Sequence, residues 1–301
     1  MIIIDGIILI NKSKGWTSHD IVNKIKHIFN VKVGHTGTLD PNATGLLPIL
    51  LGQGTKLSSY LINHDKEYLV LLKLGIKTDT ADSEGNILSE EIVDNNILNK
   101  ENVENVLKQF IGKQEQIPPM YSAIKVNGKK LYEYARKNIN IKVKPRKIEI
   151  YEIDLKNIST ENREIEFKVK CSKGTYIRSL CENIAEKLGT IGYMKELNRT
   201  VVGEFNIDDS ISVDDLEKNK SNEEYLNNHI ISIEEFFKEY KKADKIVLNE
   251  KKMKLFLNGV KLNNNEKNGD YRIYNEKNEF IGIGSNINNL LKREIIVDIL
   301  K

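Results

Sequence analysis

The segment at residues 33–56, VGHTGTLDPNATGLLPILLGQGTK, constrains this chain of 301 residues more than any other segment. Its glycines and its two prolines surround a single acidic residue, Asp40, with His35 five positions earlier. Glycine and proline at this density predict an irregular, rigid loop rather than a helix or a long strand. Such loops commonly hold catalytic groups, and Pro41 favours an extended backbone at Asp40. For an isolated Asp-Pro pair, a structural turn with a solvated aspartate is the alternative.

Spacing argues against two other kinds of site in this segment. A phosphate-binding P-loop needs a glycine, four residues and then Gly-Lys-Ser/Thr. The Gly-Thr-Lys run at 54–56 has its last two residues in the wrong order, and Ile49 stands where the first glycine belongs. His35 and Asp40 have no cysteine or second histidine beside them, so the pattern does not predict zinc. We therefore expect neither a metal nor a nucleotide cofactor.

A second acidic segment, residues 75–86, superficially suggests calcium. It carries Asp79, Asp82 and Glu84 in the sequence GIKTDTADSEGN. The spacing of an EF-hand and its terminal glutamate are absent. We interpret the segment as a polar loop.

Length and composition indicate a large domain accompanied by a small one. An apolar content of 40% supports cores of useful size. No run approaches the roughly twenty apolar residues of a membrane span. The two cysteines, Cys171 and Cys181, are too few for a disulfide framework. These features predict a cytoplasmic protein without membrane association.

Charge is unevenly distributed along the chain. Residues 121–150 contain nine lysines and arginines against two glutamates, with three tyrosines interleaved. Residues 208–239 reverse the balance, with ten acids against three lysines. A basic segment that carries aromatic side chains suits a polyanion whose bases can stack. A solvated, lysine-rich surface is the alternative interpretation.

The apolar periodicity predicts an α+β fold. Helical spacing predicts helices at residues 19–29, 100–111 and 177–188, the first of them capped by Ser18. A buried run and a strict alternation predict strands at 67–74 and 164–171. Many strands with fewer, segregated helices indicate an α+β core. After about residue 244, the short runs YRIY, EFIGIG and EIIVDIL predict a small β-rich module.

The segment around Asp40 resembles the catalytic motif of the tRNA pseudouridine synthase B family. The matching positions are Gly34, His35, Gly37, Thr38, Leu39, Asp40, Pro41, Ala43, Gly45, Gly52, Thr55 and Lys56. The resemblance covers most of the chain up to about Phe205. It implies a catalytic domain at 1–240 with a mixed, largely antiparallel sheet, and within it a basic insertion at 121–150 that clamps RNA. It also implies a small PUA-like RNA-binding domain at 241–301.

The resemblance also implies roles for single residues. Asp40 falls on the catalytic aspartate, Arg178 on the arginine that pairs with it, and Tyr68 on the tyrosine that stacks against the target base. The implied substrate-binding residues are His35, Tyr176, Leu197, Lys12, Gly37 and Thr38. The family usually has proline where this chain has Ser13, which loosens the match near Lys12.

The implied reaction breaks the N1–C1′ bond of a uridine, turns the uracil and rejoins it through C5. It requires neither electrons nor phosphate, in agreement with the missing P-loop and dinucleotide motifs. It does require a carboxylate beside the ribose. Because burial raises the pKa of an aspartate and a close arginine lowers it, we expect Arg178 to keep Asp40 charged and aimed. Attack on C1′, attack on the base and removal of the C2′ proton all remain open for Asp40.

The resemblance further implies that the substrate is the T-arm of tRNA and that the enzyme is a monomer without a protein partner. Two alternatives stay open: a pseudouridine synthase with another RNA target, and an RNA chaperone or scaffold of the same fold. A carboxylate-pair glycosidase would need a second acid, and none stands in a comparable motif. We also predict that the basic segment at 121–150 is mobile without RNA, since few apolar residues anchor its middle.

Overall fold

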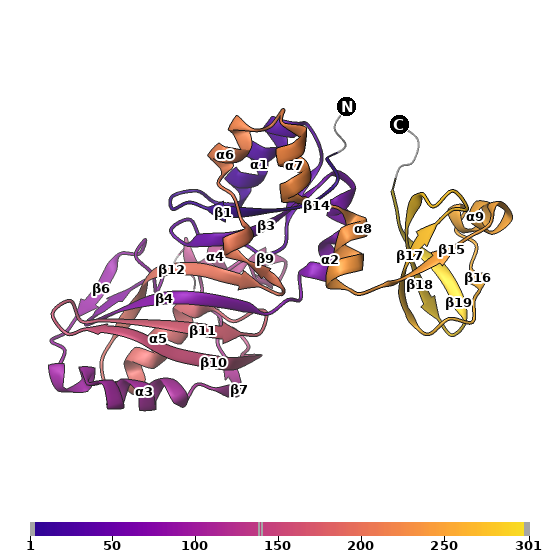
Figure 1. Ribbon diagram of the computed structural model, residues 1–301. Helices are drawn as coiled ribbons and strands as arrows, with labels where there is room; N and C mark the ends of the chain where they lie inside the picture. Colours follow the sequence, from indigo (N-terminus) through magenta and orange to yellow (C-terminus); the bar gives the residue numbers. More distant parts are fainter. Residues whose placement is uncertain (1–3, 138, 140, 298–301) are drawn as a thin grey trace.

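A ten-stranded mixed sheet forms the main body of the protein. The computed structural model describes residues 4–137, 139 and 141–297 (Figure 1). The strands follow the order β14 (Ile230–Ile231), β1 (Gly6–Lys12), β3 (Thr44–Leu51), β12 (Gly192–Val202), β4 (Lys66–Leu74), β11 (Glu164–Cys171), β10 (Arg146–Ser159) and β7 (Gly112–Gln116). At the margins, β2 (Val33–His35) pairs with β3, and β13 (Phe205–Asn206) pairs with β12.

Helices cover the main sheet and fill its connections. Those of the main body are α1 (Ser18–Phe29), α2 (Ser58–Leu61), α3 (Lys100–Lys108), α4 (Leu131–Ala135), α5 (Ile177–Lys187), α6 (Val213–Lys218), α7 (Glu223–His229) and α8 (Ile233–Glu235). Two hairpins, β5 (Ile76–Thr78) with β6 (Ile87–Glu90) and β8 (Lys125–Val126) with β9 (Lys129–Lys130), stand apart from the sheet. The α+β class with a mixed, largely antiparallel sheet is confirmed.

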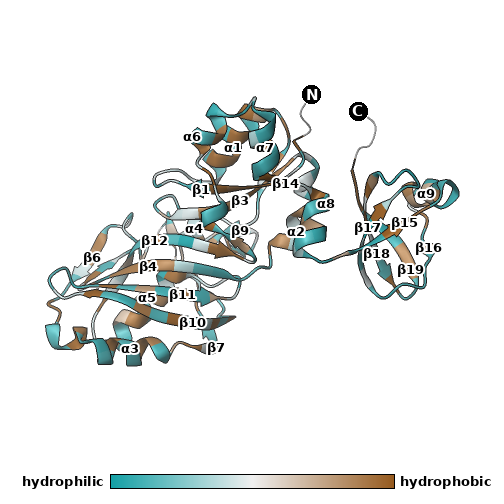
Figure 2. Ribbon diagram, viewed as in Figure 1, coloured by the Kyte–Doolittle hydropathy of each residue, from teal (hydrophilic) through white to brown (hydrophobic). Residues whose placement is uncertain are grey.

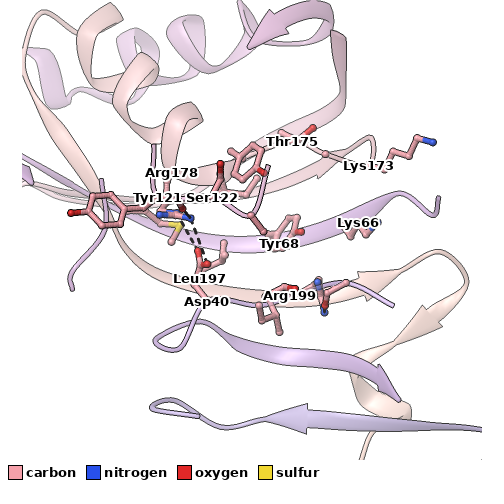
Figure 3. Close-up of a pocket in the computed structure, with 18 of the residues that line it drawn as sticks. Asp40, Lys66, Tyr68, Tyr121, Ser122, Lys173, Thr175, Arg178, Leu197 and Arg199 are labelled. Atoms are coloured by element: carbon pink, nitrogen blue, oxygen red, sulfur yellow. Dashed lines mark hydrogen bonds and ion pairs between the residues drawn. The ribbon is translucent and has the colours of Figure 1, made fainter. Parts of the chain in front are cut away.

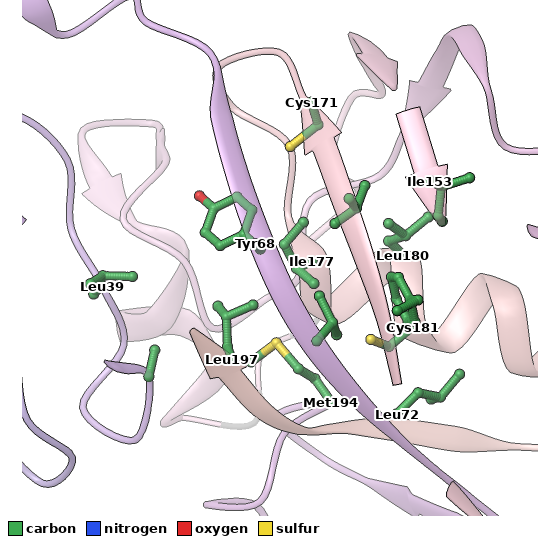
Figure 4. Close-up of a cluster of buried hydrophobic side chains, with 14 of the residues drawn as sticks. Leu39, Tyr68, Leu72, Ile153, Cys171, Ile177, Leu180, Cys181, Met194 and Leu197 are labelled. Carbon is green, nitrogen blue, oxygen red and sulfur yellow. The ribbon is translucent and has the colours of Figure 1, made fainter. Parts of the chain in front are cut away.

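The alternation of β4 decides where the site can form. Lys66, Tyr68, Val70 and Leu72 are buried on one face, whereas the residues between them are partly exposed. Helix α5 packs on β12, and α3 packs on β10, which completes the core on that side (Figure 4). The strands predicted at 67–74 and 164–171 are therefore present as β4 and β11. In Figure 2, apolar residues concentrate in the strands, whereas the surface helices mix apolar and polar positions.

The expectation that residues 33–56 form an irregular loop without a long strand is wrong, because the segment contains a long strand after the loop. Strand β3 spans Thr44–Leu51 and is almost wholly buried. Pro48 is tolerated because it lies between the residues that pair with β2, from Ile49 onward, and Gly45, which pairs with β12. Pro48 lies opposite Leu9 of β1 on one edge, whereas on the other edge it falls in the gap between β2 and β12. A proline, which has no N–H donor, is tolerated where one edge of a strand has no neighbour. The irregular part is the loop that carries Asp40.

A short parallel contact joins the two halves of the ten-stranded sheet. Thr44 and Gly45 of β3 lie opposite Asn198 and Arg199 of β12. Gly45 has φ +103°, and a Cβ there would lie 2.3 Å from Asn198 Oδ1 and 2.4 Å from the Arg199 carbonyl oxygen. Only glycine permits this approach of the two backbones. Between β3 and β4, β12 is the connecting strand.

The first helix begins differently from the prediction. Thr17, not Ser18, caps α1, through a reciprocal pair of hydrogen bonds with Asp20. The Ser18 hydroxyl instead donates to the Leu39 carbonyl oxygen at 3.1 Å and accepts from the Leu39 N–H at 2.9 Å. Helix α1 thereby fixes the loop immediately before Asp40.

The C-terminal part forms a separate five-stranded sheet beside the main body (Figure 1). Its order is β15 (Asp244–Val247), β17 (Gly269–Tyr274), β18 (Phe280–Ile287), β19 (Leu290–Ile296) and β16 (Leu262–Asn263), with α9 (Glu250–Leu257) packed against β16 and β19. Ile283 and Ile295 join the apolar cluster of Phe236 and Phe237 in the main body. The end of the predicted run EIIVDIL lies outside the described residues, and the PUA-like identity stays a prediction.

Membrane association was not expected from the sequence. Among the described residues, no helix combines the length and apolar character needed to cross a bilayer.

Candidate active site

A cavity of about 490 Å³ opens where the Asp40 loop, β4, β12 and the start of α5 meet (Figure 3). Asp40, Tyr68 and Arg178, which lie far apart in the sequence, all line it. Gly37 and Thr38 of the loop, Tyr176 before α5 and Leu197 of β12 line it as well. The structure therefore brings together seven of the nine site residues predicted from the sequence.

Asp40 and Arg178 form a two-point contact at one end of the cavity. Arg178 Nε lies 3.1 Å from Asp40 Oδ2, and Nη2 donates to Oδ1 at 3.5 Å. The side chain of Arg178 is 7% exposed, whereas that of Asp40 keeps 36% exposure. Paired N–H donors fix the plane of a carboxylate as well as its position. Asp40 is thus aimed, and still accessible to a ligand.

Arg178 is itself held by groups other than Asp40. Its Nη1 lies 3.5 Å from Asp82 Oδ2 and donates to the Thr80 carbonyl oxygen at 3.3 Å. Its Nη2 donates to the Tyr121 carbonyl oxygen at 2.9 Å. Asp82 is buried, and the Thr80 hydroxyl donates to it at 2.5 Å. The guanidinium therefore bridges two carboxylates and two backbone carbonyls.

The interpretation of residues 75–86 as merely a polar loop is wrong for Asp82. An isolated β-bridge pairs the backbone of Asp82 with that of Met194 in β12, so this part of the loop lies against the sheet. Ala81, at the turn, has φ +60°. Asp79, three residues earlier, instead accepts a hydrogen bond from the Asn86 N–H within the turn. The two aspartates look alike in sequence, and only the tertiary contact separates them.

The surroundings of Asp40 shift the pKa of its carboxyl in opposite directions. Burial raises the pKa of the Asp40 carboxyl above its ordinary value, while the Arg178 charge opposes this and the Asp82 charge adds to it. The expected lowering by Arg178 is present, but desolvation outweighs it. A carboxylate of this kind is less hydrated and more basic than one in water.

Tyr68 forms the wall of the cavity between its two ends. Its ring comes from β4 and is 8% exposed, beside Leu197, which is also 8% exposed. Burial raises the pKa of the Tyr68 hydroxyl to about 12, so the group is neutral near pH 7. A neutral ring that lines a cavity beside an aliphatic neighbour can receive a flat, uncharged heterocycle.

Gln116 holds the segment that precedes Arg178. Its Nε2 donates to the Tyr176 carbonyl oxygen at 2.9 Å, and its Oε1 accepts from the Tyr176 N–H at 2.8 Å. Tyr176 is the residue before α5. The Gln116 side chain makes the two backbone hydrogen bonds to Tyr176 that a neighbouring strand would otherwise make. Ser179 adds a hydrogen bond to the Ile117 carbonyl oxygen at 3.2 Å. The entrance to the basic segment is thus tied to the start of α5.

Lys12 and His35 do not line the cavity. Lys12 is fully buried, and its Nζ donates to the carbonyl oxygens of Ser13, Trp16 and Pro41 at 3.0, 2.7 and 2.9 Å. Desolvation lowers the pKa of Lys12 to about 8. His35 Nδ1 accepts from the Gly37 N–H at 3.3 Å, which places its proton on Nε2. Both residues support the loop, and their predicted contacts with substrate stay predictions.

Two further cations that sequence reasoning missed line the other end of the cavity. Arg199 is 2% exposed and donates to the carbonyl oxygens of Leu46 at 2.8 Å and Gly37 at 3.1 Å. Lys66 is 8% exposed and donates to the His64 carbonyl oxygen. Neither residue stood in a motif, and a lysine at the start of a strand is ordinarily a surface residue.

Comparison with known proteins decides the family. Residues 25–177 match the TruB family pseudouridylate synthase (N terminal domain), and the chain is 45% identical over 289 residues to the tRNA pseudouridine synthase B of Clostridium kluyveri, covering 94% of this chain and 96% of that protein. The chain belongs to the TruB family of pseudouridylate synthases. Residues 178–238 and 245–292 match the tRNA pseudouridylate synthase B C-terminal domain and the pseudouridine synthase II TruB C-terminal model.

Other members and solved structures agree with the TruB assignment. A tRNA pseudouridine synthase B of Francisella philomiragia is 43% identical, covering 93% of this chain and 90% of that protein. A Cbf5-Nop10-Gar1 complex contains a chain with TM-score 0.68 and 28% identity, covering 100% of this chain and 85% of that one. An H/ACA RNP bound to a substrate RNA containing 2′-deoxyuridine gives TM-score 0.67 and 25% identity, with 97% and 84% coverage. The family predicted from residues 33–56 is thus confirmed.

Proposed function

We propose that this TruB-family enzyme isomerises the uridine at position 55, in the TΨC loop of tRNA. The observation that carries the proposal is the accessible Asp40 carboxylate, gripped at both oxygens by Arg178 beside the Tyr68 ring. The relatives bear the name tRNA pseudouridine synthase B, which supports tRNA as the substrate. The particular loop is inferred from the family resemblance of the sequence.

The isomerisation conserves every heavy atom of the nucleotide. The N1–C1′ bond breaks, the uracil turns within the pocket, and a C5–C1′ bond forms; C5 gives up its proton and N1 gains one. In this proposal Asp40 supplies the carboxylate next to the ribose, and Arg178 holds its plane fixed through each step. Because bond breakage and bond formation use the same site, a fixed carboxylate serves both.

The uridine must leave its stack in RNA before it reaches Asp40. Extruding a base costs a few kcal/mol, and stacking on an aromatic ring returns about 1–3 kcal/mol. Tyr68 is the ring in position to do this, with Leu197 beside it. We assign the basic segment at 121–150 to gripping RNA, and the five-stranded C-terminal sheet to a PUA-like RNA-binding role. The division into domains at 1–240 and 241–301, the monomeric state and the cytoplasmic location stay predictions.

Asp40→Asn tests the proposal. Unmodified tRNA and an isolated T-arm stem-loop are incubated with each protein, and pseudouridine is mapped by carbodiimide labelling. The unmodified enzyme should convert one uridine in the T-loop of both RNAs. Asp40→Asn should convert none and should bind tRNA within a few-fold of the wild-type affinity, because asparagine preserves shape and removes the charge. Retained turnover would sink the role of Asp40, and a different converted uridine would establish another RNA target.

A further inference from the structure

The cavity that holds Asp40 has a second end of opposite character. Figure 3 shows Asp40 and Arg178 on one side of Tyr68, and Lys66, Lys173 and Arg199 on the other. We call these three residues the cationic end of the cavity. All three line the same space as Asp40.

The charges at the cationic end lack carboxylate partners. Within the described part of the chain, neither Lys66 nor Arg199 forms an ion pair, although both are more than nine-tenths buried. Their hydrogen bonds go to backbone carbonyl oxygens and, for Arg199, also to the Tyr68 hydroxyl, which is neutral. A buried charge without a counter-charge is costly for a folded protein.

The cations also oppose one another. Desolvation lowers the pKa of Lys66, and the charges of Arg199 and Lys173 lower it further. Asp65 is the nearby carboxylate, but its effect on Lys66 is smaller than that of Arg199, and its own hydrogen bond is from the Tyr151 hydroxyl. Lys66 uses one of its three N–H donors, so two remain for a ligand. An anion placed here would relieve the repulsion and the desolvation together.

Polar groups beside the cations fit the same ligand. Thr36 lines the cavity and is 2% exposed, and its hydroxyl makes no hydrogen bond to any described residue. Ser172 and Thr175 also line the cavity near Lys173. Hydroxyl and ammonium donors around a buried arginine are typical of phosphate recognition.

We propose that the cationic end binds a phosphodiester of the RNA strand next to the target uridine. The inference rests on the proposed function, since a uridine held at Asp40 and Tyr68 is joined on both sides to phosphodiesters of the same strand. The cavity then binds two parts of the RNA: the neutral base beside Tyr68 and the anionic phosphate at Lys66 and Arg199. An isolated uracil or uridine, which lacks the phosphate, would leave these charges unpaired.

Binding of a synthetic T-arm stem-loop to Asp40→Asn protein tests the inference without turnover. Lys66→Met in that background should weaken binding roughly 10- to 100-fold, because a charge-assisted contact is lost. The slope of log affinity against log salt should fall by about 0.7, the value for one phosphate contact in a single strand. Lys170→Met is the matched control: this lysine lies on β11 next to Cys171, which pairs with Lys66, but it is exposed on the opposite face. It should change neither quantity by as much.

A second measurement does not depend on the folding of a variant. Single methylphosphonate linkages, which are neutral, are placed one at a time along the loop of the RNA. One position beside the target uridine should weaken binding to the parent protein, and the same position should have little effect with Lys66→Met. If no position in the loop matters to the parent, or if every position matters equally with and without Lys66, the inference is overturned.

Two further arms separate the possible explanations. Inorganic phosphate that competes with RNA for the parent protein but not for Lys66→Met supports an anion site at this end. If such competition occurs while every methylphosphonate RNA binds normally, a free anion and not the RNA occupies the site, and the inference is overturned. Pseudouridine formation by the unmutated enzyme in the same stem-loop is measured first. Its absence counts against the proposed function, whereas normal formation with unaltered binding by Lys66→Met counts against the phosphate site alone.

Discussion

Arg178 and Asp82 form an ion pair at 3.5 Å between side chains that are 7% and 8% exposed. Asp82 contacts Nη1 of the guanidinium, whereas Asp40 contacts Nε, so the two carboxylates bind different nitrogens of Arg178. Truncating one partner of a buried charge pair leaves the other uncompensated, so Asp82 has more influence on Arg178 than an exposed carboxylate would have.

Asp82→Asn should slow turnover by about 10²-fold, because a small displacement of Arg178 misplaces the Asp40 carboxylate. RNA affinity should change little, since Asp82 lies behind Arg178 and does not line the main cavity. Single-turnover rates of pseudouridine formation measure the effect. Asp79→Asn, in the same loop, is the control, and it should retain nearly full activity. An Asp82→Asn enzyme with a normal rate would show that Arg178 needs no second carboxylate.

The pH dependence of the reaction should reflect the raised pKa of Asp40. If the ionised carboxylate is the active form, activity falls as the pH drops through this pKa, and the acid limb lies above the ordinary value for aspartate. The negative charge of Asp82 contributes to the rise, so Asp82→Asn should move the limb to lower pH even as the rate falls. Single-turnover rates between about pH 4 and 8 test both points. A limb that stays in place in Asp82→Asn would show that the two carboxylates do not interact.

Lys12→Met should reduce the free energy of unfolding by about 2–4 kcal/mol, since three carbonyl oxygens lose a charged donor. The pKa of Lys12 is lowered from 10.5 to about 8, so above pH 8 the unfolded chain holds a proton that the folded chain has released. Stability from this group therefore rises with pH between about 8 and 10.5. Denaturant unfolding at several pH values should show that slope in the wild type and in the exposed control Lys14→Met, but not in Lys12→Met.

Hydrogen exchange tests the prediction that the basic segment at residues 121–150 is mobile without RNA. The structure places residues from Arg146 onward in β10, and within 121–145 it describes a short hairpin and α4, with Leu131 buried. Amides of 121–145 should exchange much faster than those of β10 in the free protein, and should slow when tRNA is added. Strong protection in the free protein would contradict the predicted mobility and point to a preformed clamp.

The strands β4 and β11 and the residues around Asp40 could be predicted because the local sequence pattern agrees with the tertiary structure at these positions. The alternation in β4 and β11 follows directly from burial of one face, and Tyr68 lies on that face. Asp40, Tyr68 and Arg178 converge as the family resemblance implied. The density of glycine and proline gave the wrong expectation for β3, because Pro48 falls where one edge of the strand, between β2 and β12, has no neighbour.

The remaining parts of the site depend on tertiary burial and leave no local trace. Asp79 and Asp82 share a loop and a residue type, and only the bridge to Met194 buries one of them. Lys66 is the first residue of β4, and it is buried because strands flank it on both sides, at Cys171 of β11 and Val202 of β12. Thr17 and Ser18 are equally good caps in sequence, and the Leu39 backbone decides between them.

The parallel contact between β3 and β12 also sets an order of events during synthesis. Asp40 and Tyr68 leave the ribosome long before β12, yet in the finished sheet β12 lies between β3, which follows the Asp40 loop, and β4, which carries Tyr68. Arg178 and Arg199 arrive with that late part of the chain, and Gly45 must wait for Asn198 before the two halves can join. A nascent chain therefore carries its carboxylate without its counter-charge and without a closed sheet. The cavity gains its wall from Leu197 and Arg199 only when β12 has been made, so a chain that ends before β12 lacks the assembled site.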